Sequence, residues 1–91
     1  MHSVYRIKNH LNRIVYIGQT KNIHVRAHRH EHKQVNGTIE FCEVECAEHG
    51  KRIELVLLSL FKPILNIRIP KSNPLMPEGV SFNSLTWQLL K

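Results

Sequence analysis

The chain has 91 residues, and its 13 Lys and Arg against 7 acidic residues give a formal charge of +6. This is the length of one small domain, so a second folded domain is not expected. All seven acidic residues are Glu. The absence of Asp excludes both the multi-aspartate two-metal centres of many enzymes and Asp-based catalytic triads.

The positive charge is concentrated in residues 1–36, which hold seven Lys or Arg and one Glu. A cationic segment of this kind attracts polyanions, and nucleic acid is the commonest polyanionic partner of a small domain. The sequence therefore indicates nucleic acid as the partner. A solvated cationic surface without a specific partner is the alternative.

Three further features bear on location and redox state. No apolar run approaches the roughly 18 to 20 residues that a membrane span needs, and the N-terminus lacks the apolar core of a signal peptide. We therefore expect a cytoplasmic protein with no membrane partner. Cys42 and Cys46 would lie about 13 Å apart on a strand, which is too far for a disulfide or a shared zinc ion.

Three segments have the patterns of strands. Residues 3–8 alternate in polarity, and residues 14–17 are β-branched or aromatic and end at Gly18, so these two segments are expected to pair as a hairpin. Residues 38–45 alternate again after a turn signal at Asn36-Gly37, which predicts a third strand.

Two segments have the patterns of helices. Asn22 can cap a helix that runs from Ile23 to about residue 33. A second and more apolar helix is expected over residues 47–62, because Pro63 cannot continue it. Both helices carry polar residues at positions where a purely structural helix would be apolar.

The last part of the chain, residues 70–91, differs in composition from the domain expected over residues 1–69. Three Pro residues and Gly79 indicate an extended connection along the surface. Phe82, Leu85 and Leu89 then recur near helical spacing. This spacing predicts either a short helix packed on the domain or a contact segment for a partner.

The first expected helix presents basic groups on two sides. At about 100° per residue, Arg26 and His30 share the side of Ile23 and Ala27, so the core-facing surface also carries an Arg and a His. Snorkelling of both side chains to water is the structural alternative. The opposite side forms either a solvated or DNA-facing ridge or, with further ligands, a zinc site; its members are His24, His28 and His32.

Glu54 interrupts the apolar stripe of the second expected helix. Leu57, Leu58 and Phe61 follow it at i+3, i+4 and i+7. A carboxylate is rarely buried without an Arg, a hydrogen-bond network or a metal ion. Glu54 therefore either forms a structural ion pair, for example with Arg26, or serves as a ligand to Mg²⁺. This cation takes one or two carboxylates and keeps several waters.

These residues form one ordered pattern. Ser3-Val4-Tyr5 and Tyr16-Ile17-Gly18 lie on the paired strands, and the chemically active residues that follow are Arg26, His30, Glu54 and Asn66. Over residues 3–67 the pattern resembles the GIY-YIG nuclease family, which includes domains of bacterial excision-repair incision enzymes and phage homing endonucleases. The first motif departs from the family pattern by lacking its leading Gly, and Ser in its place costs little where φ is negative.

The resemblance implies an α+β fold with a small three-stranded antiparallel sheet flanked by helices. It implies a DNA endonuclease that hydrolyses phosphodiester bonds with one Mg²⁺, for which Mn²⁺ can substitute. It also implies roles at the site: Tyr5 and Tyr16 at the scissile phosphate, Arg26 stabilising it, His30 assisting proton transfer, Glu54 binding the metal, and Asn66 supporting the site. The DNA backbone is expected against Arg6, Lys8, Arg13, Lys21, Arg29 and Lys33.

Three functions stay open at this point. The leading one is a metal-dependent DNA endonuclease, structure-directed or weakly sequence-specific, whose small size fits a phage or mobile-element origin. The second is a non-catalytic nucleic-acid-binding module of the same fold. The third is a protein-interaction or zinc-binding domain that uses the His ridge and the C-terminal segment. Because little chain lies outside the nuclease-like region, a homodimer or a protein partner would supply specificity if DNA structure does not.

Overall fold

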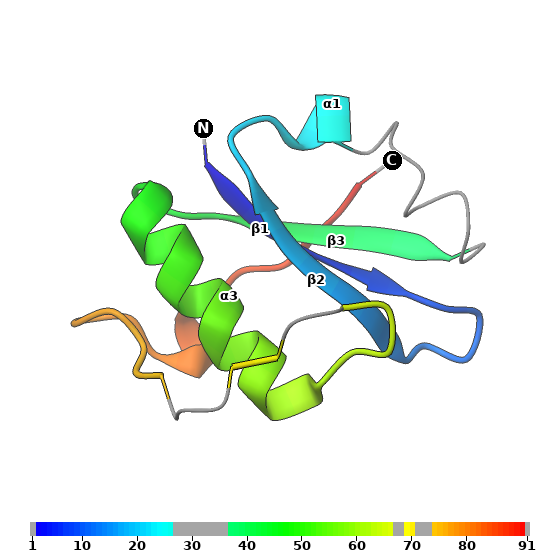
Figure 1. Cartoon of the computed structure of the whole chain (residues 1–91). Helices are drawn as coiled ribbons and strands as arrows, with labels where there is room; N and C mark the ends of the chain where they lie inside the picture. Colours follow the sequence, from blue (N-terminus) through cyan, green and yellow to red (C-terminus); the bar gives the residue numbers. More distant parts are fainter. Residues whose placement is uncertain (1, 27–36, 67–68, 71–73, 91) are drawn as a thin grey trace.

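The computed structural model describes residues 2–26, 37–66, 69–70 and 74–90. The described elements are β1 (Ser3–Lys8), β2 (Ile14–Thr20), α1 (Ile23–Arg26), β3 (Thr38–Glu43), α3 (Ala47–Phe61), a 3₁₀ turn (Phe82–Ser84) and β4 (Gln88–Leu89). The strands form one antiparallel sheet in the order β2-β1-β3-β4, and α3 lies across one of its faces (Figure 1). This confirms the α+β fold and adds a short fourth strand.

The hairpin of β1 and β2 is set by its turn. The side-chain oxygen of Asn9 accepts hydrogen bonds from the backbone N–H groups of Leu11 and Arg13, at 2.9 and 3.0 Å. Asn12 takes the left-handed conformation with φ 62°, which Asn tolerates better than most residues. The resulting register places Tyr5 opposite Gly18, which brings the two sequence motifs face to face.

Each face of the sheet has its own apolar cluster. On the α3 face, Val4 and Ile17 pack with Ile53 and other residues of the helix. On the opposite face, a second cluster gathers side chains of β1, β2 and β3 with one residue of α1; its buried members are Tyr5, Ile7, Val15, Ile23 and Ile39. Both faces of the hairpin are therefore covered by buried apolar side chains.

The helices begin and end where local chemistry directs them. Asn22 caps α1, because its side-chain oxygen accepts the N–H of Val25 at 3.2 Å. The remainder of the helix expected to residue 33 lies outside the described residues. α3 ends one residue before the expected position, at a left-handed Lys62 whose N–H bonds to the carbonyl of Leu58, and Pro63 follows. No described helix has the length and apolar character needed to cross a bilayer.

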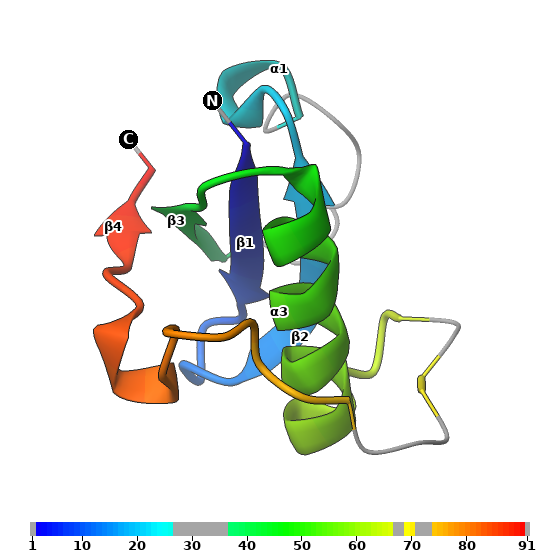
Figure 2. The same cartoon turned by 90° about the vertical axis from the view of Figure 1, so that its left-hand side faces the viewer.

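The C-terminal segment, residues 74–90, packs against the domain without forming an α-helix. The helical spacing noted above is thus misleading: Ser81 and Ser84 close a single 3₁₀ turn, and the extended chain after Leu85 pairs with the edge of β3. Trp87 packs over the guanidinium of Arg6, 4.0 Å from the ring centroid. The segment runs from the α3 side to the outer edge of the sheet (Figure 2). It completes the apolar cluster under α3.

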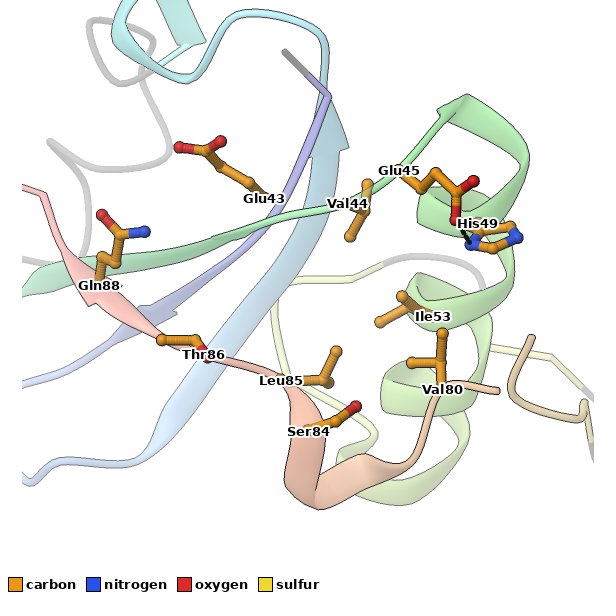
Figure 3. Close-up of a pocket in the computed structure, with 10 residues that line it drawn as sticks. All are labelled: Glu43, Val44, Glu45, His49, Ile53, Val80, Ser84, Leu85, Thr86 and Gln88. Atoms are coloured by element: carbon orange, nitrogen blue, oxygen red, sulfur yellow. Dashed lines mark ion pairs between the residues drawn. The ribbon is translucent and has the colours of Figure 1, made fainter. Parts of the chain in front are cut away.

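A pocket of about 350 Å³ remains between this segment, β3 and the start of α3. Ile53, Val80 and Leu85 line its apolar wall, and the Glu45 carboxylate lies 3.7 Å from His49 at its rim (Figure 3). Neither the two motif tyrosines nor Glu54 is among its described lining residues. The pocket is therefore separate from the site that the motifs define.

Candidate active site at the free edge of β2

The first group of the site is the phenol of Tyr5, whose ring lies directly over Gly18. Tyr5 is only 1% exposed. A Cβ added at Gly18 would stand 2.6 Å from its hydroxyl oxygen, so no other residue fits beneath the ring. Tyr16 lies on the same face of the sheet, with its ring centroid 6.0 Å from that of Tyr5. The structure thus brings the two motif tyrosines together.

Arg26 reaches the same phenol from α1. Its Nε donates a hydrogen bond to the hydroxyl oxygen of Tyr5 at 3.0 Å. The short connection from β2 is held by Thr20, whose hydroxyl accepts the N–H of Asn22 at 3.1 Å. The end of β2 therefore delivers the guanidinium to the tyrosine within six residues of the strand. His30 lies outside the described residues, so its place relative to this pair is not described.

Glu54 approaches from the other side of the sheet, on α3. Its carboxylate is half-buried, and burial raises its pKa; Lys51, a hydrogen bond from Gln19 and the charges of Arg26 and His2 act in the opposite direction. Among the described residues, ion pairs within 4.0 Å involve Glu40 and Glu45 but not Glu54. The structural ion pair with Arg26 is therefore not formed, although the charge of Arg26 helps to lower the pKa of Glu54.

Asn66 holds the strand that carries the second motif. Its side-chain oxygen accepts the N–H of Ile17 and its amide donates to the carbonyl of the same residue, both at 2.9 Å. The neighbouring Leu65 N–H bonds to the carbonyl of Val15 at 3.0 Å. The loop after α3 thus pairs with the free edge of β2 as a strand would. In this position Asn66 holds the backbone of Ile17, between Tyr16 and Gly18.

The six basic residues expected against DNA occupy three kinds of position. Arg6 and Lys8 both contact the carboxylate of Glu40, at 2.7 and 3.1 Å. Arg13 and Lys21 are exposed at the two ends of β2. The remaining pair, Arg29 and Lys33, lies outside the described residues. Only Lys21 is therefore seen both exposed and close in sequence to the Tyr5–Arg26 pair.

Glu40 partly neutralises the first two of these cations. Burial works to raise the pKa of Glu40, but the hydrogen bonds and charges of Arg6 and Lys8 outweigh it and lower the pKa. Arg6 stands opposite Glu40 in the register of β1 and β3. This cluster faces α3 and Trp87 rather than the tyrosines, so it stabilises the sheet.

The described residues include two side chains at the site that the sequence analysis did not select. Gln19 helps to lower the pKa of Glu54, and His2 hydrogen-bonds to Gln19 at 2.6 Å. Gln19 directly follows the second motif and, two residues after Ile17, lies on the same face of the strand. This position was the signal available in the sequence. The contact of His2 with Gln19 joins residues 17 positions apart, and no local sequence pattern predicts it.

The zinc alternative finds no support in the described part of the chain. His24 is exposed on α1, whereas His28 and His32 lie outside the described residues. Among the described residues, no group of three or more His, Cys, Asp or Glu is arranged to hold a metal ion. A dedicated cage of protein ligands, as zinc requires, is thus not seen there.

A hydrogen-bonded tyrosine and arginine, a nearby glutamate and a strand-clamping asparagine are arrayed around one sheet edge. Comparison with known proteins assigns the chain to a family, because a model of the GIY-YIG catalytic domain matches residues 1–66. UvrABC system protein C of Mycoplasmoides gallisepticum (strain R(low / passage 15 / clone 2)) is 37% identical over 79 residues. That similarity covers 76% of this chain but 13% of the relative. No solved structure matches significantly. The chain belongs to the GIY-YIG nuclease family.

Proposed function

We propose that this chain is a DNA endonuclease that hydrolyses phosphodiester bonds with one divalent cation bound at Glu54. The observation that carries the proposal is the hydrogen bond between Tyr5 and Arg26, at the strand end from which Gln19 reaches Glu54. These groups come from β1, β2, α1 and α3, and the sequence separates them by up to 49 positions. Membership of the nuclease family supports the reaction class.

The surroundings of Glu54 fit a hard cation with few protein ligands. The carboxylate is half-buried and held by the neutral amide of Gln19, so its negative charge is not cancelled by a close ion pair with a described residue. Mg²⁺ is bound by one or two carboxylates and completes its coordination with water and substrate phosphate oxygens. Mg²⁺, with Mn²⁺ as a substitute, is therefore the proposed cofactor. When bound, the cation would supply Lewis-acid stabilisation of the leaving 3′ oxygen.

The chemistry assigned to the protein begins at Tyr5. Hydrolysis requires a water to lose a proton and the phosphate to be stabilised as negative charge develops on it. The Tyr5 oxygen accepts that proton, for which the phenol is first ionised. The cationic Arg26, whose Nε lies 3.0 Å from this oxygen, stabilises the negative charge of the ionised phenol. The guanidinium fork also suits a phosphate oxygen. His30 is the proposed next proton acceptor, as the family resemblance implies.

DNA is the proposed partner, and its backbone would approach the face that carries Lys21, Arg26 and the tyrosines. Arg29 and Lys33 continue the same basic segment in sequence. The described residues outside the family match are the 3₁₀ turn, β4 and their connections, which pack on the domain. Selection of a DNA site by DNA structure, by a second copy of the chain or by a protein partner is proposed.

The test is cleavage of supercoiled plasmid and of linear, nicked, flapped and branched DNAs in Mg²⁺. We expect nicking by the wild-type protein, and a loss of at least 100-fold in the Tyr5→Phe, Arg26→Ala and Glu54→Gln variants. Arg52→Ala, an exposed change on α3, is the matched control for Arg26→Ala and should retain activity. DNA binding should survive in Glu54→Gln.

Two outcomes would contradict the proposal in different ways. Wild-type protein that binds DNA but never nicks any substrate would identify a non-catalytic module of the same fold. Undiminished cleavage by Glu54→Gln would refute the assignment of the cation to this carboxylate while leaving the nuclease reaction intact.

A further inference from the structure

His2, Gln19 and Glu54 form a row of polar side chains between the sheet and α3. The ring Nε2 of His2 lies 2.6 Å from the side-chain oxygen of Gln19. The side-chain oxygen of Gln19 lies 3.0 Å from where a Cβ of Gly50 would stand, one turn before Glu54 on α3, and the amide of Gln19 helps to lower the pKa of the Glu54 carboxylate. His2 and Gln19 are half-buried, and Gln19 faces α3 beside Ile17 and opposite Val4. The row therefore runs from the chain segment before β1, across β2, to the helix.

The direction of each hydrogen bond follows from the chemistry of the groups. An ionised carboxylate only accepts hydrogen bonds, so Gln19 must present its NH₂ group to Glu54. The amide oxygen of Gln19 then points to His2, whose Nε2 must carry the hydrogen. The reverse orientation would set the amide oxygen against a carboxylate oxygen. His2 thus fixes the orientation of Gln19 that suits an ionised Glu54.

A missing side chain in α3 makes room for the row. Gly50 lies one turn before Glu54, on the same side of the helix. A Cβ at this position would stand 2.6 Å from the ring of His2 and 3.0 Å from the oxygen of Gln19. Gly in a helix interior costs about 1 kcal/mol relative to Ala. The helix accepts this cost at the one place where the imidazole and the amide must approach its backbone.

We infer that Gln19, oriented by His2, is a positioning residue for Glu54 and sets the affinity of the carboxylate for its cation. This inference rests on the proposed function. A neutral amide restrains one carboxylate oxygen without cancelling the charge, which leaves the group directed and still anionic. A Lys or Arg at the same distance would compete with the cation for that charge. Groups behind a metal ligand typically change metal affinity by about 10- to 100-fold when removed.

The experiment measures Mn²⁺ binding to the DNA-free protein by electron paramagnetic resonance of the free ion. We expect Gln19→Leu to weaken binding about tenfold, and His2→Phe, which keeps the ring but removes its donor, to weaken it about threefold to tenfold. His2→Gln restores an N–H donor and should return the affinity to within about threefold of wild type. His10→Phe, on the exposed β1–β2 turn, is the matched control and should have no effect.

The double variant His2→Phe with Gln19→Leu supplies the readout that a purely structural role would not give. If His2 acts only through Gln19, the double variant should bind Mn²⁺ as Gln19→Leu alone does. Unfolding temperatures in EDTA show that each variant is folded at the temperature of the titration.

The outcomes separate this inference from the proposed function. Loss of binding in Glu54→Gln combined with unchanged affinity in Gln19→Leu and His2→Phe would overturn the inference alone. Additive effects in the double variant would also overturn it. Failure of the folded wild-type protein to bind Mn²⁺ with or without DNA would overturn both.

Discussion

Replacing Glu54 by Gln should separate the function of this carboxylate from its effect on stability. Burial raises the pKa of Glu54, which means that ionisation is less favourable in the folded chain than in the unfolded chain. Glutamine has the same shape and can still accept the hydrogen bond from Gln19. We therefore expect Glu54→Gln to abolish cleavage and, in the absence of metal, to increase the free energy of unfolding at pH 7.

The size of the increase follows from how the carboxylate is surrounded. A shift of one pKa unit corresponds to about 1.4 kcal/mol. The charges of Lys51 and Arg26 and the hydrogen bond from Gln19 offset part of the burial penalty, so the effect is smaller than the several kcal/mol of a fully buried charge. We expect about 1 kcal/mol, which in a domain of this size raises the unfolding temperature by roughly 4–8 °C.

The pH dependence of the free energy of unfolding tests separately whether Glu54→Gln stabilises the chain. Below the ordinary Glu pKa of about 4.3, Glu54 is protonated in both states and the variant should have no advantage. The advantage appears as the pH rises through the elevated pKa of the folded chain, and is constant above it. Unfolding in urea with EDTA from pH 4 to 8 measures this, with Glu78→Gln, in an exposed turn, as the control.

Metal should reverse the order of stability. A cation that binds only the folded wild-type chain stabilises it by mass action, so Mg²⁺ should raise the unfolding temperature of the wild type and not of Glu54→Gln. A variant that is less stable than wild type at pH 7 in EDTA, or an advantage that persists at pH 4, would refute the reasoning.

Three further predictions concern the scaffold. Asn66→Ala removes both hydrogen bonds to Ile17 and should lower the free energy of unfolding by about 2 kcal/mol in urea titration; an unchanged midpoint would contradict the clamp. Burial raises the pKa of Cys42 to about 11, so iodoacetamide at pH 8 should modify only the exposed Cys46, as mass spectrometry of the folded protein would show. Because its two cations lower the pKa of Glu40, Glu40→Gln should cost about 1 kcal/mol at pH 7, and the difference should vanish as the pH falls through that lowered pKa.

Much of the fold could be predicted because local patterns determine it. The apolar stripe and Pro63 locate α3 to within one residue, and alternation locates β1. Glu54 was selected because a carboxylate in an apolar stripe demands a partner, and the structure supplies one in Gln19. These features depend on residues close to one another in sequence, or on a chemical rule that needs no coordinates.

The basic residues show where this reasoning stops. A count of charges places Arg6 and Lys8 among the DNA-facing cations. The alternation of side chains along β1, however, turns both toward the α3 face. Glu40, 34 residues after Arg6, meets them only because of the register between β1 and β3. No local pattern contains that register. The same holds for β4, which is two residues long and exists because the edge of β3 was open.

The arrangement of the site follows from the alternation of one strand. Gly18 and Gln19 are consecutive in β2, so they face opposite sides of the sheet. Gly18 receives the ring of Tyr5 on one side, and Gln19 reaches Glu54 on the other. Because β2 is the edge strand of the sheet, Gly18 and Gln19 both lie at its border. A slip of one residue in the register would exchange these two faces, which explains why Asn66 clamps the strand at the preceding residue.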